Sequence, residues 1–152
     1  MIEKIIKLYL TGLCIGNLKY APGTFGTMLA IPIYILIANN NINFNIIFIL
    51  ILTLLSIFIL KLSYKKLIYR NIDDKSIVID EIIGYLSFMI FFEPTFNNII
   101  FGFFIFRFFD IIKPFPISII DKNIKNSLGI ILDDVVAGLF SGISLYFLLY
   151  AF

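Results

Sequence analysis

Residues 46–60 of the chain read IIFILILTLLSIFIL and carry no charge. A second uncharged stretch, VVAGLFSGISLYFLLYAF, covers residues 135–152. At ~1.5 Å of rise per residue, each approaches the ~20 residues that a helix needs to cross the hydrocarbon of a bilayer. Of the 152 residues, 61% are hydrophobic and only 14% are charged, well away from the composition of a soluble domain. These features predict a membrane-embedded protein.

Five hydrophobic segments can be read along the chain, at residues 25–38, 44–60, 82–92, 99–109 and 135–152. The expected fold is therefore all-α, one compact membrane-embedded domain over residues 1–152 with about four to five hydrophobic helices. The third and fourth segments are short, since a helix of eleven residues is only ~16 Å long. Either they form a re-entrant hairpin, or their helices extend into the charged flanks, from near Ile77 and through Lys113.

The charges are distributed unevenly around these segments. If the segments alternate sides, all twelve Lys and Arg residues fall on one side, together with every acidic residue except Glu93. The other side receives NNNIN (39–43), EPTFNN (93–98) and the C-terminus. Because basic residues favour the cytoplasmic side, we expect a multi-pass protein of the bacterial inner (cytoplasmic) membrane with its polar chemistry on the cytoplasmic face.

Functional groups concentrate at four places on the basic side: APGTFGT (21–27), IDEIIG (79–84), FRFFDIIKPFP (106–116) and LGIILDDVVAG (128–138). The first is a glycine-rich turn at a helix start, where free N–H groups favour anions, although Thr24 could simply be the N-cap. In the third, Arg107, Asp110 and Lys113 recur every third residue and therefore share one face of a helix. Each place alone also has an ordinary structural reading, as a helix terminus or an internal ion pair.

Taken together, the four places predict chemistry on a phosphate. Charged residues at membrane depth are energetically costly, and they are retained mainly when they form ion pairs or have a function. Adjacent carboxylates repel one another unless a cation binds them, and the hard cation for an all-oxygen site is Mg²⁺. Arg107 as a planar fork and Lys113 as a point charge suit a phosphate group. Carboxylates, a divalent cation and phosphate-binding basic side chains are the groups that metal-assisted phosphoryl transfer requires. At the depth of the lipid headgroups, the expected phosphate substrate is a lipid.

The ordered motifs APGTFGT, DEIIG, FRFFDIIKPFPISIIDKN and GIILDDVVAG resemble the phosphatidylglycerophosphatase A family, from about Leu13 to Gly142. The resemblance implies a Mg²⁺-dependent phosphatase that converts phosphatidylglycerophosphate to phosphatidylglycerol and inorganic phosphate. It implies catalytic roles for Asp80, Glu81, Arg107, Asp110, Lys113, Asp133 and Asp134. It implies substrate binding by Thr24, Arg107 and Lys113, and metal binding by Asp80, Glu81, Asp110, Asp133 and Asp134. Asp121 lies in the matched stretch but can also be read as a helix cap.

Several other functions are excluded or disfavoured by the sequence. The chain has no histidine, which excludes phosphatases that use an imidazole nucleophile or base. A CDP-alcohol phosphotransferase would need a spaced array of aspartates, which DDVVAG resembles only weakly. The remaining alternatives are a carboxylate-lined membrane transporter, which predicts charges near mid-span, and a small structural membrane subunit. The expected partners are the lipid substrate and the bilayer, and no nucleic acid. Direct attack by water is preferred, with a covalent carboxylate or Thr24 intermediate left open.

Overall fold

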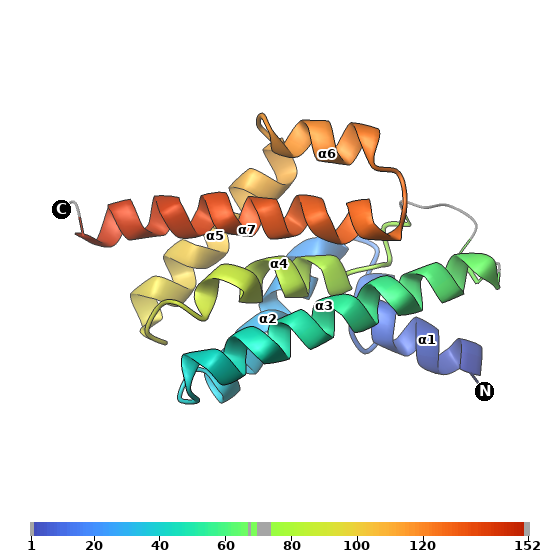
Figure 1. The fold of residues 1–152 in the computed structure, drawn as a ribbon, viewed down its shortest axis with the longest axis horizontal. Coiled ribbons are helices and arrows are strands. Elements are labelled where there is room, and N and C mark those ends of the chain that lie inside the picture. Colours follow the sequence, from blue (N-terminus) through green and yellow to red (C-terminus); the bar gives the residue numbers. More distant parts are fainter. Residues whose placement is uncertain (1, 67, 70–73, 151–152) are drawn as a thin grey trace.

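The fold is all-helical, as the sequence predicts. The computed structural model describes residues 2–66, 68–69 and 74–150, so Arg70 and Asp73, counted in the charge asymmetry, lie outside the described residues. The described residues form seven α-helices and one short 3₁₀ helix (Figure 1). These are α1 (Ile2–Leu10), η1 (Ile15–Asn17), α2 (Pro22–Ile37), α3 (Ile42–Lys65), α4 (Ile79–Met89), α5 (Phe96–Ile112), α6 (Ile117–Asn123) and α7 (Ser127–Tyr150).

Local sequence explains where these helices begin and end. Asn41 caps α3 by accepting a hydrogen bond from the Asn43 backbone N–H, and Thr95 caps α5 by accepting one from the Asn98 N–H. The last turn of α5 ends at Lys113, whose φ of 45° is left-handed. Helix α5 extends into its charged flank as far as Ile112, as the extended version predicts, whereas α4 begins at Ile79 and remains eleven residues long.

Two helices differ from the sequence-based expectation. Helices α1 and α6 lie outside the five hydrophobic segments and were not predicted. The last hydrophobic segment, drawn from residue 135 directly after Asp133 and Asp134, also begins too late, because α7 starts at Ser127. Asn126 sets this start, since its side-chain oxygen accepts hydrogen bonds from two backbone N–H groups at 2.9 and 3.0 Å. Both aspartates consequently lie inside α7, about two turns from its beginning.

Helix α4 is the centre of the molecule. Almost all of its residues are buried, and it packs against α2, α3, α5 and α7. Its contact with α7 is close: a Cβ on Gly84 would lie 2.8 Å from the backbone oxygen of Asp134, and one on Gly138 would meet the Gly84 carbonyl. Gly84 follows Asp80 by one helical turn, and Gly138 follows Asp134 by one turn. The close approach of the two backbones therefore brings Asp80 and Asp134 together.

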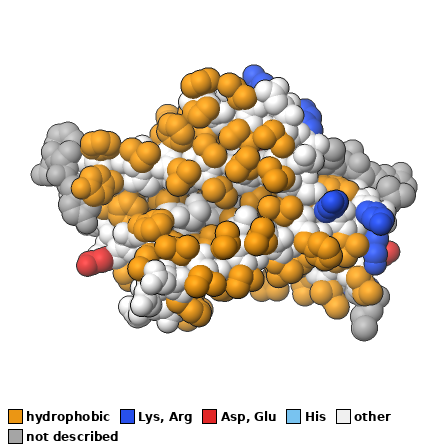
Figure 2. Space-filling model, viewed as in Figure 1, with side chains coloured by type: hydrophobic (Ala, Val, Ile, Leu, Met, Phe, Trp, Pro, Cys, Tyr) orange, Lys and Arg blue, Asp and Glu red, His pale blue; other side chains and the backbone are white. Residues whose placement is uncertain are grey.

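The exterior of the bundle is suited to lipid. Among the described residues, two helices are long and apolar enough to cross a membrane, α3 and the Ser127–Leu149 part of α7. Only 22% of the most apolar window of α3 is buried, unlike the core helix of a soluble protein. Its exposed side chains include Phe44, Ile47, Leu50, Ile51, Leu54 and Phe58. Figure 2 shows hydrophobic side chains across most of one face, with Lys and Arg gathered towards one end. We therefore treat the protein as membrane-embedded.

The polar connections separate to the two ends of the bundle. The α2–α3 connection, with Asn39 and Asn40, and the α4–α5 connection, with Glu93, line the same hollow. The first residues of α2 and α4 and the last of α5 line a different cavity with the early part of α7. This separation is the one that alternating segments predict.

Candidate active site

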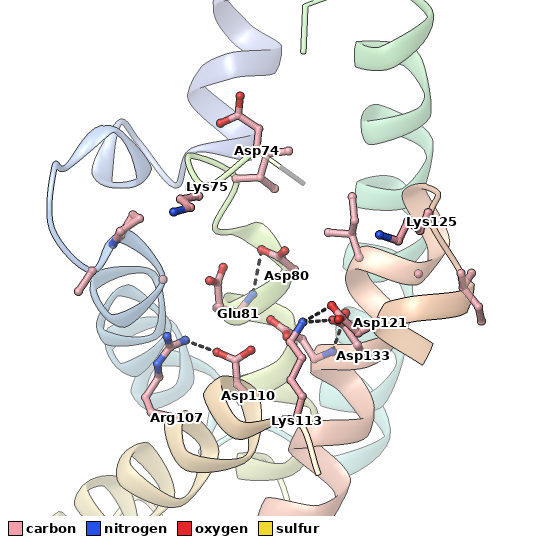
Figure 3. Close-up of a pocket in the computed structure, with 18 residues that line it drawn as sticks. Asp74, Lys75, Asp80, Glu81, Arg107, Asp110, Lys113, Asp121, Lys125 and Asp133 are labelled. Carbon is pink, nitrogen blue, oxygen red and sulfur yellow. Dashed lines mark hydrogen bonds and ion pairs between the residues drawn. The ribbon is translucent and has the colours of Figure 1, made fainter. Parts of the chain in front are cut away.

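The charged motifs meet in one cavity of about 340 Å³ (Figure 3). It is formed by the starts of α2 and α4, the end of α5, the early part of α7, and the connections before α4 and α7. Its described charged lining consists of Asp74, Lys75, Asp80, Glu81, Arg107, Asp110, Lys113, Asp121, Lys125, Asp133 and Asp134. All four sequence motifs contribute residues to the lining of the cavity, the motif at 21–27 through Ala21, Pro22 and Gly23, as expected for one site.

Three carboxylates form the densest group in the cavity. Asp80, Glu81 and Asp134 each offer an oxygen atom, and these oxygens lie within 4.8 Å of one another. Asp134 is buried, whereas Asp80 and Glu81 are half-buried. Among the described residues, the buried Oε2 atom of Glu81 has no hydrogen-bond partner. Partial burial and the neighbouring Glu81 carboxyl group both disfavour a negative charge on Asp80. Unless a cation neutralises it, this arrangement is electrostatically unfavourable.

Such a group fits a divalent cation. The donor set consists of carboxylate oxygens alone, which suits hard ions such as Mg²⁺ rather than ions that prefer nitrogen or sulfur ligands. The buried, unpartnered oxygen of Glu81 is available for coordination. Because α4 begins immediately before Asp80, its first turn supplies two of the three carboxylates. The cluster can therefore bind a metal ion.

The start of α2 covers this cluster closely. Ala21 has a left-handed φ of 47°, and Pro22 occupies the first turn of the helix. A Cβ on Gly23 would collide with Oε1 of Glu81 and would lie 3.2 Å from a terminal nitrogen of Arg107. Only glycine leaves room for both side chains at this point. The glycine-rich motif at 21–27 therefore acts through close backbone approach.

Arg107 and Asp110 form an ion pair on one face of α5, as their spacing predicts. Nη1 of Arg107 lies 2.5 Å from Oδ2 of Asp110, and both side chains are largely buried. The same nitrogen donates a long hydrogen bond of 3.4 Å to Oγ1 of Thr27 on α2. The Nε atom of Arg107 is buried and has no partner among the described residues. The guanidinium is thus anchored at one nitrogen beside the carboxylate cluster.

Lys113 departs from the face that it was expected to share. The left-handed backbone at Lys113 ends α5, and its Nζ donates to Asp121 at 2.6 Å and to Asp133 at 2.5 Å. Burial by itself would lower the pKa of Lys113, but these two hydrogen bonds outweigh it and raise that pKa above its ordinary value. Lys113 therefore links the end of α5 to α6 and α7 as a fixed positive charge.

Most of the residues singled out from the sequence meet here, and Thr24 is the exception. Asp80, Glu81, Arg107, Asp110, Lys113, Asp133 and Asp134 all line the cavity, whereas Thr24 does not. Thr24 is not the N-cap of α2 either, since that position is Ala21. Asp121 is within α6 and pairs with Lys113 rather than capping a helix. Sequence reasoning did not single out Thr27, Lys75 or Lys125. Thr27 lies in a quoted motif, whereas Lys75 and Lys125 lie in none.

Comparisons with known proteins identify the family of the chain. Residues 8–149 match the family model of phosphatidylglycerophosphatase A. The phosphatidylglycerophosphatase A of Escherichia coli (strain K12) is 31% identical over 134 residues, covering 88% of this chain and 77% of that protein. The protein of the same name from Haemophilus influenzae (strain ATCC 51907 / DSM 11121 / KW20 / Rd) is 31% identical over 147 residues, covering 95% and 89%. No solved structure matches the chain. The chain belongs to the phosphatidylglycerophosphatase A family.

Proposed function

We propose that this chain removes the terminal phosphate of phosphatidylglycerophosphate and releases phosphatidylglycerol and inorganic phosphate. Family membership supports the substrate and the reaction. The observation that carries the proposal is the carboxylate cluster of Asp80, Glu81 and Asp134, which shares one cavity with Arg107 and Lys113. A site for a divalent cation next to two fixed positive charges suits a phosphomonoester.

The metal in this proposal is Mg²⁺, held by Asp80, Glu81 and Asp134. Bound Mg²⁺ would neutralise charge on the phosphate oxygens and make the phosphorus easier to attack. Asp110 and Asp133 were also expected as ligands, and each of them is bound to a basic side chain. We therefore assign Asp133 to holding Lys113 in place, and Asp110 to orienting Arg107 and accepting a proton.

The chain's own residues then carry the rest of the reaction. Arg107 uses Nη1 for Asp110, which leaves its other terminal nitrogen free to donate to a phosphate oxygen. Lys113 supplies a second positive charge where negative charge grows in the transition state. A water oxygen forms a bond to phosphorus as the bond to the glycerol oxygen breaks. The proton of that water passes to Asp110, and the leaving glycerol oxygen takes a proton from solvent.

We further propose that the cavity faces the cytoplasm, with the protein embedded in the inner membrane of a bacterium. If the segments alternate sides, all twelve basic residues fall on the side of the cavity, whereas the opposite connections carry none. The charged lining gathers at this one end of the bundle. This distribution supports a lipid-processing enzyme over the transporter alternative, which predicts charges near mid-span.

The experiment is phosphate release by the purified full-length protein in detergent. The substrates are phosphatidylglycerophosphate, phosphatidic acid and glycerol 3-phosphate, each with Mg²⁺ and with a chelator in its place. We expect release from phosphatidylglycerophosphate that requires Mg²⁺ and exceeds release from the other two. Equal release from all three, or full release with chelator present, would contradict the proposal.

A further inference from the structure

The charge of the cavity is unfavourable for its proposed substrate. Seven acidic and four basic side chains line it within the described part of the chain. Phosphatidylglycerophosphate carries a phosphomonoester, with a charge of about −1.5 to −2 near neutral pH, and also a phosphodiester. One divalent cation leaves the lining slightly negative. Each basic side chain in the cavity is therefore important for attracting the lipid.

Two of the four basic side chains are already occupied. Arg107 is paired with Asp110, and Lys113 is bonded to two aspartates. Lys75 and Lys125 differ, since neither makes a side-chain hydrogen bond or ion pair with another residue that the structure describes. Both are exposed. Within the part of the chain that the structure describes, they are the cations of the cavity that remain available to a ligand.

The backbones that carry these two lysines are held in place. Lys75 lies in a turn fixed by Asp74, whose Oδ1 accepts from the backbone and the side chain of Ser76 at 3.0 and 2.7 Å. Lys125 immediately precedes Asn126, the N-cap of α7. Figure 3 shows the two lysines on either side of Asp80, at the end of the cavity away from Lys113. The two lysines therefore flank the acidic centre of the cavity from two sides.

The substrate has a second phosphate that needs such a partner. Its phosphodiester is separated from the terminal phosphate by the three carbons of a glycerol. With the terminal phosphate beside Arg107 and Lys113, Lys75 and Lys125 are the remaining described cations of the cavity that can receive the diester. We infer that Lys75 and Lys125 form a phosphodiester subsite, which positions the lipid and selects substrates that carry both phosphates. This inference rests on the proposed function and adds specificity-determining residues to it.

The subsite has a consequence for the product. Phosphatidylglycerol keeps the phosphodiester and lacks the phosphomonoester, so it occupies the subsite and competes with the substrate. Inorganic phosphate is the complementary probe, because it resembles only the phosphomonoester. Phosphatidylglycerol therefore reports on the subsite of Lys75 and Lys125. Inorganic phosphate reports on the position beside Arg107 and Lys113.

The test measures hydrolysis of phosphatidylglycerophosphate in mixed micelles by the wild type, Lys75→Gln, Lys125→Gln and the double variant. Lys122→Gln is the matched control, since Lys122 is exposed on α6 but does not line the cavity. We expect each cavity variant to raise KM for the substrate and the inhibition constant of phosphatidylglycerol by roughly threefold to tenfold. The kcat and the inhibition constant of inorganic phosphate should change less than about twofold, and arginine at either position should restore binding.

Three results would overturn the inference. They are unchanged inhibition by phosphatidylglycerol in the double variant, an equal loss of inhibition by inorganic phosphate, and the same effect in Lys122→Gln. The last would mean that bulk charge attracts the lipid. A wild-type protein that releases no phosphate from phosphatidylglycerophosphate would instead overturn the proposed function. Hydrolysis by the wild type is therefore measured before any variant is compared.

Discussion

Replacing Arg107 with lysine tests whether this residue binds the substrate or only neutralises Asp110. Lysine keeps the positive charge beside Asp110 but offers one nitrogen where arginine offers a planar fork. Because Nη1 of Arg107 is occupied by Asp110, the single nitrogen of lysine cannot also keep the arginine's geometry towards a phosphate. The variant should lose about one charge-assisted hydrogen bond, worth ~1.5–3 kcal/mol. That loss corresponds to a fall of roughly tenfold to 150-fold in kcat/KM.

The assay for Arg107→Lys is Mg²⁺-dependent phosphate release, measured beside a melting curve in the same detergent. The melting temperature should stay close to that of the wild type, because the charge next to Asp110 is retained. Lys113→Arg is the comparison, and it should be milder because Lys113 acts as a point charge. Unchanged turnover with a lowered melting temperature in Arg107→Lys would refute the reasoning. So would recovery of both properties when Asp110→Asn is combined with Arg107→Gln.

Three further predictions concern the metal cluster, the helix packing and the topology. In Gly23→Ala the new methyl group should displace the flexible Glu81 side chain, raising the Mg²⁺ concentration needed for half-maximal activity with little change in melting temperature; an unchanged Mg²⁺ requirement would argue against Glu81 as a ligand. Gly84→Leu should force α4 and α7 apart and destabilise the protein by at least ~1–3 kcal/mol in denaturant titrations, and a wild-type melting curve would contradict the packing described. Cysteines at Asn41 and Asn97, in a background without other cysteines, should react with an impermeant reagent from the periplasmic side of intact inner membranes, whereas labelling only after permeabilisation would reverse the topology.

Much of the fold could be predicted because membrane segments are recognised from composition alone. The uncharged stretch at 46–60 lies in α3, and the alternation of polar connections is observed. The start of α7 was misplaced because the segment was drawn from its uncharged part, whereas the helix begins at a cap, Asn126. Helix α1 was missed because its mixture of lysines and apolar residues does not form an uncharged run.

The site was predictable to the extent that its groups are local in sequence. The ion pair of Arg107 and Asp110 follows from helical spacing, since both residues lie on the same helix face. The partners of Lys113 could not be read from spacing, because a left-handed residue at the helix end redirects its side chain. The role of Gly23 depends on the approach of α2 to Glu81, a contact between segments far apart in the chain. Contacts of this kind become visible only when the helices are packed.

The central claim is that Asp80, Glu81 and Asp134 form the metal site of a lipid phosphatase. The most direct measurement is Mg²⁺-dependent phosphate release from phosphatidylglycerophosphate by the double variant Asp80→Asn with Asp134→Asn. Asparagine keeps the size of each side chain and removes its charge, so the variant should melt near the wild-type temperature yet lose at least ~100-fold in turnover, a barrier increase of several kcal/mol. Full activity in the folded double variant would contradict the account.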